Sequence, residues 1–520
     1  MFKRTVPVAL ALCAGLLVGC ASDEAIEVTE GFFGSVAVDE PRAAVIAQEI
    51  LVQGGTAADA AVSAYFTLAV TLPSSAGLGA GGSCLAFDPE SKRFERLSFL
   101  PHPLSGEQNA IAAPLGPRAM FALHARYGRL PITQLIGVPE QLARFGEPVS
   151  RRLAEDLARD GAALKSSGAG RLNVFAPDGV ALQAGHSLVQ LDLASTYGRL
   201  RVAGVGDLYS GQLANRFVAG AEAFGYEVDR ARLRGAVPIW TDAEGVDFDN
   251  HVWAVAASRN ADNALISKIL SLAFNEAGWS SSPQDVDPLM LAEMQVRAAN
   301  AVANGDTDPS ADAAERLFGD FRSGTPRTAV APAAAALFGG EAQSGATSFV
   351  ITDRRGLSVG CALTMNAPFG TGQTLPDLGF IPAPALPSSN PPLAAAIIAG
   401  NTHAWQVHMT AMATGGRETV SALVPPILRH YVAGQEMSAA VAAPRSHFDL
   451  AADTLSIESG IAPAAGALAA RAGYSVQPAA QPIGAVRLFR CKEGLPRSDK
   501  DCGIADDPRG RGMILFEGGN

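Results

Sequence analysis

The residues best placed to do chemistry lie in the segment from Gln343 to Asp353, which reads QSGATSFVITD. Thr347 carries a hydroxyl that could attack an amide carbonyl, whereas its neighbour Ala346 carries only a methyl group. The apolar run from Phe349 to Ile351 predicts that this segment is a strand. Because side chains alternate between the two faces of a strand, Ala346 and Thr347 must point in opposite directions. The chemistry of the segment therefore depends on which of these two side chains points toward a substrate.

The familiar catalytic and metal-binding motifs do not point to a site elsewhere in the chain. We expect no GxSxG nucleophile elbow, and the chain has no HExxH or CxxC motif. His403 and His408 are five residues apart and would not share a helix face, so the sequence predicts no metal site and no cofactor. The glycine-rich run GLGAGG at 77–82 precedes a strand and lacks GK[ST], which favours close backbone packing over phosphate binding.

The first twenty residues predict export. Lys3 and Arg4 precede an apolar run at 6–18, which is the plan of a secretory signal and is too short to span a bilayer. The run ends in LVGC, which resembles the lipobox of bacterial lipoproteins, with the lipid on Cys20 and the domain facing the periplasm. We therefore expect a signal peptide over 1–19, a tether over 20–35 and a membrane partner through the lipid. An ordinary signal peptide with a chance cysteine is the alternative.

The cysteines after Cys20 matter because export means an oxidising compartment. Cys491 and Cys502 flank a polar, turn-rich segment, which suits a local disulfide. Cys84 and Cys361 lie in apolar runs, and we interpret them as small buried hydrophobic residues. The net charge of −11, with acids and bases interspersed, argues against a nucleic-acid partner.

Helical and strand patterns alternate along the chain, which suggests layered packing of helices and sheets. Apolar spacing predicts helices over 43–70 with a break at Gly54 and Gly55, over 117–165 with a break at 126–131, and over 211–224, 287–303 and 419–442. Strands are predicted over 83–87, 346–353, 357–366, 454–457, 485–488 and 512–516. The composition of 304–345 predicts a flexible linker between a region over 36–345 and a region over 346–520.

Several motifs, in this order, resemble the gamma-glutamyltransferase (glutathione hydrolase) family of N-terminal-nucleophile hydrolases. The matching stretches are QGGTAADAAVSAYFTLAVTLPSSAGLGAGG at 53–82, RYGRLP at 126–131, FGEPVSRRL at 145–153, LYSGQLA at 208–214, TDRRG at 352–356, LTMNAPFGTG at 363–372, PSS at 387–389 and TGG at 414–416. The resemblance implies an α+β fold, a four-layer αββα sandwich. It also implies a precursor that cuts itself at the linker and frees a threonine that attacks a gamma-glutamyl amide.

The resemblance also assigns roles to single residues. Gly415 and Gly416 would offer N–H groups to the oxyanion, Thr364 and Asn366 would support the nucleophile and substrate, and Ser388 and Ser389 would contact the glutamyl end. Each also has a structural interpretation, as a polar strand end, a turn or a conformational glycine.

Three departures from the family pattern argue against activity. The family reads Thr-x-His at the cut, and an alignment on Asp353 and Gly356 places Ala346 on the nucleophile and Thr347 on the variable position. Leu100 stands where the family has the arginine that holds the substrate carboxylate, and GFIPAPAL at 379–386 has no acid for the substrate amine. The sequence thus predicts an uncharged pocket in an inactive member that either binds a small gamma-glutamyl or peptide-like ligand or plays a structural role. The alternative is an active amide hydrolase that uses Thr347 at a cut shifted by one residue.

Overall fold

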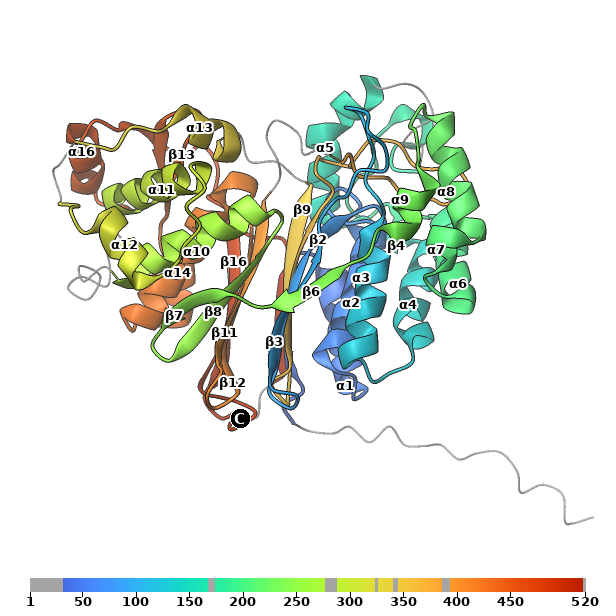
Figure 1. The fold of residues 1–520 in the computed structure, drawn as a ribbon, viewed down its shortest axis with the longest axis horizontal. Coiled ribbons are helices and arrows are strands. Elements are labelled where there is room, and N and C mark those ends of the chain that lie inside the picture. Colours follow the sequence, from blue (N-terminus) through green and yellow to red (C-terminus); the bar gives the residue numbers. More distant parts are fainter. Residues whose placement is uncertain are drawn as a thin grey trace, which may run out of the picture.

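Two β-sheets lie face to face, and helices cover both outer faces, so the molecule has four layers (Figure 1). The computed structural model describes residues 31–166, 174–275, 288–322, 326–339, 345–385 and 393–517. This architecture confirms the αββα sandwich expected from the sequence. In the described part of the chain, the helices are too short or too polar to cross a membrane.

The first sheet has seven strands in the order β18-β1-β9-β10-β2-β3-β6. Their bounds are β1 Gly34–Val38, β2 Gly81–Asp88, β3 Arg93–Phe99, β6 Ile239–Asp242, β9 Ala346–Asp353, β10 Ser358–Thr364 and β18 Met513–Glu517. The second sheet has the order β17-β16-β12-β11-β8-β7, with β7 Gly245–Phe248, β8 His251–Ala257, β11 Ala394–Asn401, β12 Gln406–Thr414, β16 Ala485–Leu495 and β17 Cys502–Asp506. Small sheets join β13 Ser446–Asp449, β14 Thr454–Ile457 and β15 Ser475–Pro478, and β4 Glu147–Pro148 with β5 Ser187–Leu188.

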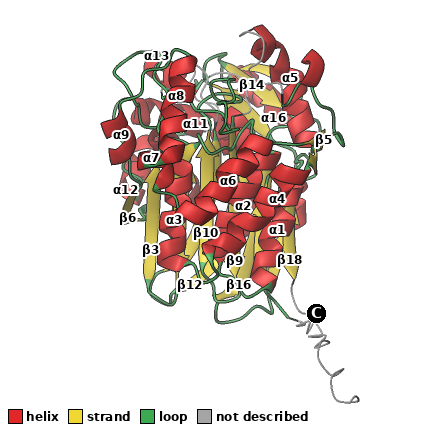
Figure 2. Cartoon of the chain, turned by 90° about the vertical axis from the view of Figure 1, so that its right-hand side faces the viewer, coloured by secondary structure: helices red, strands yellow, loops and turns green. Residues whose placement is uncertain are grey.

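Helices from the first half of the chain cover the first sheet (Figure 2). They are α1 Pro41–Val52, α2 Ala57–Thr71, α3 Leu115–Tyr127, α4 Ile132–Phe145, α5 Arg151–Ser166, α6 Leu191–Ala203, α7 Asp207–Ser210, α8 Gln212–Ala223 and α9 Arg230–Gly235. The outer face of the second sheet carries α10 Asn260–Asn275, α11 Pro288–Ala303, α12 Ala311–Phe318, α13 Pro332–Phe338, α14 Thr419–Ile427, α15 Met437–Ala442 and α16 Pro463–Arg471. The helix expected over 419–442 continues beyond α14 as a π-helical turn, Leu428–Val432, and breaks between Val432 and Met437.

Helix α2 is the centre of the first helical layer, and every one of its residues is buried. A helix that is apolar on all sides is typical of a protein interior, and its many alanines allow neighbouring elements to approach closely. Thr56 and Asp59 form a reciprocal capping box at its start. The Asp353 carboxylate at the end of β9 accepts the Ala57 N–H at 3.0 Å, which fixes α2 on the first sheet.

The two regions separated by the expected linker do not form separate domains. Each sheet contains strands from both sides of residue 345, so neither region has a core of its own. Two helices, α12 and α13, lie within the segment 304–345 that the composition suggested as a linker. Phe318 and Phe338 are buried against the second sheet's helices, and this apolar burial holds the segment in place.

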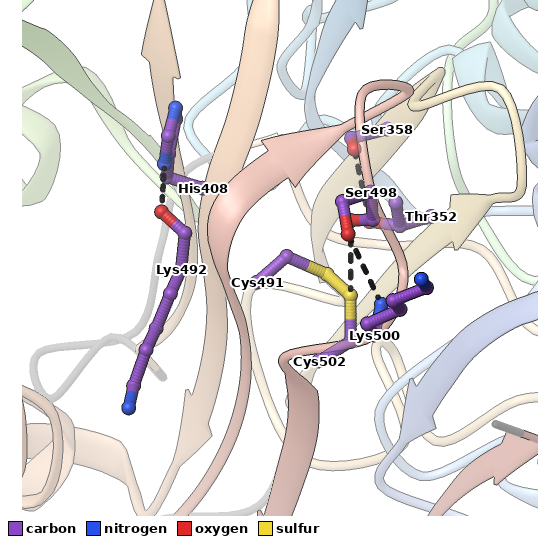
Figure 3. Close-up of a disulfide and its surroundings, with 8 residues drawn as sticks. All are labelled: Thr352, Ser358, His408, Cys491, Lys492, Ser498, Lys500 and Cys502. Carbon is purple, nitrogen blue, oxygen red and sulfur yellow. Dashed lines mark hydrogen bonds between the residues drawn. A yellow bond between two sulfur atoms is a disulfide. The ribbon is translucent and has the colours of Figure 1, made fainter. Parts of the chain in front are cut away.

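The structure pairs Cys84 with Cys361, which corrects the interpretation of these residues as free buried thiols. The two cysteines face each other in the register between β2 and β10, at a Cα–Cα separation of 4.0 Å. Cys491 and Cys502 also form a disulfide, between β16 and β17, as the spacing suggested (Figure 3).

Candidate active site at the start of strand β9

Strand β9 presents alternate side chains to two different layers. The Ser348 hydroxyl donates to the Ala413 carbonyl of β12, in the opposite sheet, at 3.0 Å. Val350 belongs to the apolar cluster between the sheets, whereas Phe349 and Ile351 belong to the cluster between the first sheet and its helices. By this alternation Ala346 lies on the face toward the second sheet, and Thr347 lies on the face toward the helices.

Thr347 is completely buried on the helix side of the sheet. It pairs with Leu363 of β10, whose side chain belongs to the same helix-facing cluster. Within the described part of the chain, the Thr347 hydroxyl has no hydrogen-bond partner. A nucleophile must reach a substrate, so this orientation does not suit the role given to Thr347 in the alternative hypothesis.

The Gly345 peptide, which precedes Ala346, is held at both its polar groups. Its N–H donates to the Ser75 hydroxyl at 3.1 Å, and its carbonyl accepts the Met365 N–H at 2.8 Å. Gly345 has a φ of +107°, and a Cβ atom there would lie 2.7 Å from the Ala367 carbonyl carbon, so only glycine fits. The peptide bond that the family pattern would cut is thus fixed in a conformation that few residues can adopt.

Thr364 and Asn366 lie beside this peptide. Thr364 pairs directly with Ala346 in the sheet, so the two side chains share a face. The Thr364 hydroxyl lies 3.4 Å from the Gly345 carbonyl oxygen and accepts the Asn366 N–H at 2.9 Å. The Asn366 side chain donates to the Pro384 carbonyl at 3.0 Å. This bond places the segment around Pro384, which has no acidic residue, close to Thr364 and the Gly345 carbonyl.

Gly415 and Gly416 form the turn that follows β12. Both have positive φ, +138° and +60°, and a Cβ atom on Gly415 would lie 2.6 Å from the Gly484 Cα. Because Ser348 touches Ala413, the start of β9 and this turn lie at the same end of the sandwich. Ser388 and Ser389 fall outside the described residues, as does Cys20.

Charged residues that the sequence did not point to also gather at this end, which corrects the expectation of an uncharged pocket. Asp39, just after β1, accepts the Thr414 hydroxyl at 3.2 Å and lies 3.7 Å from the Arg487 guanidinium and 3.8 Å from that of Arg152. All of these side chains are buried except Arg152, which is partly exposed. Arg152 also lies 3.4 Å from Asp156, so each carboxylate already has a cationic neighbour.

Two serines link this charged cluster to the Gly345 peptide. The Ser74 hydroxyl donates to Asp156 at 2.6 Å and lies 3.5 Å from the hydroxyl of Ser75. A polar chain therefore runs from the N–H of Gly345 through both serines to Asp156. The residues come from segments far apart in the sequence. The family motifs PSSAGLGAGG and FGEPVSRRL could have drawn attention to the two serines and Arg152, but Asp39, Asp156 and Arg487 lie outside them.

The glycine-rich run at 77–82 has a packing role, as expected. A Cβ atom on Gly79 would lie 2.3 Å from the Ile381 carbonyl, and one on Gly82 would lie 2.2 Å from the Ala362 carbonyl. One GxSxG string, Gly356 to Gly360, does occur, but it opens strand β10 and does not form an elbow. Its Ser358 hydroxyl is buried 2.9 Å from that of Thr352 (Figure 3).

A model of the gamma-glutamyltranspeptidase family matches residues 43–383 and 393–515. The chain belongs to this family. It is 24% identical to the glutathione hydrolase proenzyme of Pseudomonas aeruginosa, with 97% of this chain and 98% of the relative covered. It is 25% identical to the glutathione hydrolase proenzyme of Bacillus subtilis over 81% and 82% of the two chains.

A third relative has a different name. The acylase ACY 1 proenzyme of a Pseudomonas species is 26% identical over 68% of each chain. Among solved structures, cephalosporin acylase from Bacillus halodurans aligns with a TM-score of 0.75 over 97% of this chain and 99% of its own, at 17% identity. At that identity the alignment establishes the shared fold, and the chemistry of this chain has to be argued from its own residues.

Proposed function

We propose that this chain is a gamma-glutamyltranspeptidase-family protein that neither cuts its own backbone nor transfers gamma-glutamyl groups, and that it binds a ligand at the cell envelope. One observation carries the proposal. The side chain at the start of β9 that faces the second sheet is the methyl group of Ala346, because Ser348, two residues along, contacts Ala413. A methyl group can attack neither a peptide bond nor a substrate.

The surroundings of Ala346 support the same conclusion. Leu100 follows the end of β3 and offers no charge to a substrate carboxylate. Residues 379–385 offer backbone carbonyl groups to the site through Pro384, but no carboxylate. The charges that are present, Asp39 and Arg152 among them, are already paired with one another. Loss of a nucleophile costs on the order of a millionfold in rate in other hydrolases, so residual turnover by this route would be negligible.

The retained groups favour binding of a small amide-bearing molecule. The turn at Gly415 and Gly416 and the Thr364 hydroxyl lie at the same end of the sandwich as Ala346 and offer polar groups there. Relatives are named for glutathione hydrolysis and for acylase activity, and both reactions act on amide bonds. We propose a gamma-glutamyl or peptide-like ligand and a lipid tether on Cys20 that keeps the protein at a bacterial membrane, facing the periplasm.

A denaturing gel tests the loss of self-cleavage, provided that the sample is reduced. Cys84 lies before residue 346 and Cys361 lies after it, so their disulfide would hold two fragments together without a reductant. We expect one band for the reduced, purified protein and no hydrolysis of a gamma-glutamyl anilide. Two fragments under reducing conditions, with the smaller one beginning at residue 346 or 347, would refute the proposal.

A second candidate is an amide hydrolase that is cut one residue later and uses the Thr347 hydroxyl, although this hydroxyl faces the helices in the uncut chain. A buried hydroxyl without a partner in the described structure calls for an explanation, and a functional role is one. This candidate requires scission that depends on the hydroxyl, so Thr347→Ala would abolish it and Thr347→Ser would keep it. Intact chains from the unmodified protein and from both variants would eliminate this candidate.

A further inference from the structure

The chain enters the sandwich at the end opposite to the candidate site. Strand β1 begins at Gly34, which pairs with Asp353 at the far end of β9. The Phe33 carbonyl accepts the Arg354 N–H at 3.1 Å, so the entry point lies directly beside the β9–β10 turn. Ala346 lies at the other end of β9, which at the usual rise per residue is roughly 23 Å away.

Four turns lie close to this entry point and enclose a surface groove of about 520 Å³. The groove is lined by Pro89, Glu90, Lys92, Arg355, 403–406 and 496–497. A Cβ atom on Gly356 would lie 2.8 Å from the Leu495 carbonyl and 3.1 Å from the Pro89 ring, so the turns pack against each other. The groove is therefore formed by turns that pack against one another at this end of the sandwich, and it is not a gap between separate loops.

Positive charge gathers at this end, although the whole chain carries −11. The exposed basic residues of the turns are Lys92, Arg354, Arg355, Lys492, Arg497 and Lys500, and the exposed acids are Glu90, Glu493, Asp499 and Asp501. Three of these cations, but only Glu90 among the acids, line the groove, and Glu90 lies 3.7 Å from Arg355. Exposed His403 lines it as well.

Trp405 gives the groove an aromatic wall. Its ring stacks on Phe87 with the centroids 5.8 Å apart, and the residue has a φ of +53°, so the indole is held in one position. The side chain remains partly exposed. A half-exposed tryptophan among lysines and arginines is typical of protein surfaces at the level of lipid headgroups.

We propose that this end of the sandwich, defined by the turns at 89–92, 354–356, 402–405 and 492–501, docks on the anionic phospholipid headgroups of a bilayer. The inference rests on the proposed function in one respect, because the proposed Cys20 lipid is what brings the protein to a membrane. The contacts between the groove and the headgroups do not depend on that lipid. Roughly a dozen residues separate Cys20 from Phe33, and that length of chain reaches at most about 40 Å. The tether joins the fold beside this basic end, which favours the orientation in which this end meets the bilayer, and the candidate site lies at the opposite end of β9.

The test is cosedimentation of the chain from Ala21 onward with vesicles, which separates the groove from the lipid anchor. Every residue of the three buried clusters lies after residue 31, so this chain keeps the whole described fold. We expect binding to vesicles of phosphatidylglycerol and phosphatidylcholine, little binding to phosphatidylcholine alone, and release in 0.5 M salt. Sedimentation that is equal on the two kinds of vesicle would overturn the proposal.

A charge-reversal variant and a matched control identify the surface. Lys92→Glu with Arg355→Glu and Arg497→Glu should weaken binding at least about tenfold, given the contribution of each cation near an anionic surface. The control, Arg216→Glu with Arg234→Glu and Arg316→Glu, makes the same change in net charge at exposed positions on α8, α9 and α12. Equal loss in both variants would mean that net charge alone drives binding, and the docking surface would be wrong. The mass of the mature N-terminal peptide reports the Cys20 lipid independently.

Discussion

The Ser348 hydroxyl and the Ala413 carbonyl form a hydrogen bond of 3.0 Å that crosses from one sheet to the other. This bond orients the whole of β9, because a shift of one residue would move every side chain of the strand to the opposite face. It places the methyl group of Ala346 on the side of Gly415 and Gly416. It also leaves Thr347 in the helical layer, where Phe349 and Ile351 pack.

If only the hydroxyl is missing, then Ala346→Thr should restore some self-cleavage. The Gly345 carbonyl is already held by the Met365 N–H, and the glycine conformation is already in place. We expect slow scission before residue 346, seen as two bands on a reducing gel and by N-terminal sequencing of the smaller one.

The control for this variant is Ala346→Val, which has the shape of threonine without the hydroxyl. Scission in both variants would show that strain, and not nucleophilic attack, breaks the chain. An intact Ala346→Thr protein with unchanged folding would mean that other groups of the cutting machinery have been lost as well.

The disulfide between Cys84 and Cys361 should contribute more stability than the one between Cys491 and Cys502. The first closes a loop of 277 residues and the second a loop of 11. In the chain-entropy model, a disulfide that closes a longer loop stabilises the folded state more. Removal of a native disulfide typically costs 2–5 kcal/mol. The double serine variant at 84 and 361 should therefore lower the free energy of unfolding in urea by about 4 kcal/mol. The variant at 491 and 502 should lower it by about 2 to 3 kcal/mol, and the reverse order would contradict the model.

Local patterns in the sequence predicted most of the elements that position the site. The β9–β10 hairpin and the α1–α2 pair formed as expected, because apolar spacing and the Gly54 turn are local signals. The Cys84–Cys361 disulfide was missed because strand pairing between distant segments sets it. The same reason explains why Asp39, Arg152, Asp156 and Arg487 were not expected at the site, since they come from three segments far apart in the sequence: the end of β1, helix α5 and strand β16.

Glu418 should make the protein less stable as the pH rises toward neutrality. Burial raises the pKa of this carboxyl to about 7 from an ordinary value near 4.5, and the bond from the Gly484 N–H offsets this only partly. The folded state then binds more protons than the unfolded state between these values, so the contribution of Glu418 to stability falls from pH 4.5 to 7 and is constant above.

The matched variant is Glu418→Gln, which keeps an oxygen acceptor for Gly484 and removes the titration. The difference in unfolding free energy between variant and parent should shift in favour of the variant by up to about 3 kcal/mol from pH 4.5 to pH 7.5. Urea denaturation at several pH values measures it, and a difference that stays constant across this window would contradict the raised pKa.

The buried charges beside the site should be held together by Asp39. Its carboxylate faces Arg152 and Arg487, and Asp39→Asn would leave the buried Arg487 without this charge while Asp506 remains 2.9 Å away. Removing one partner of a buried ion pair typically costs 3–5 kcal/mol. Because Arg487 keeps its contact with Asp506, we expect Asp39→Asn to lower the free energy of unfolding by about 3 kcal/mol.

Asp453→Asn is the control for this variant. The Asp453 carboxylate pairs with Arg327 but is 46% exposed, and such pairs contribute at most about 1 kcal/mol. Urea unfolding of both variants decides the matter. Equal and small losses would mean that water, and not Asp39, stabilises the two arginines.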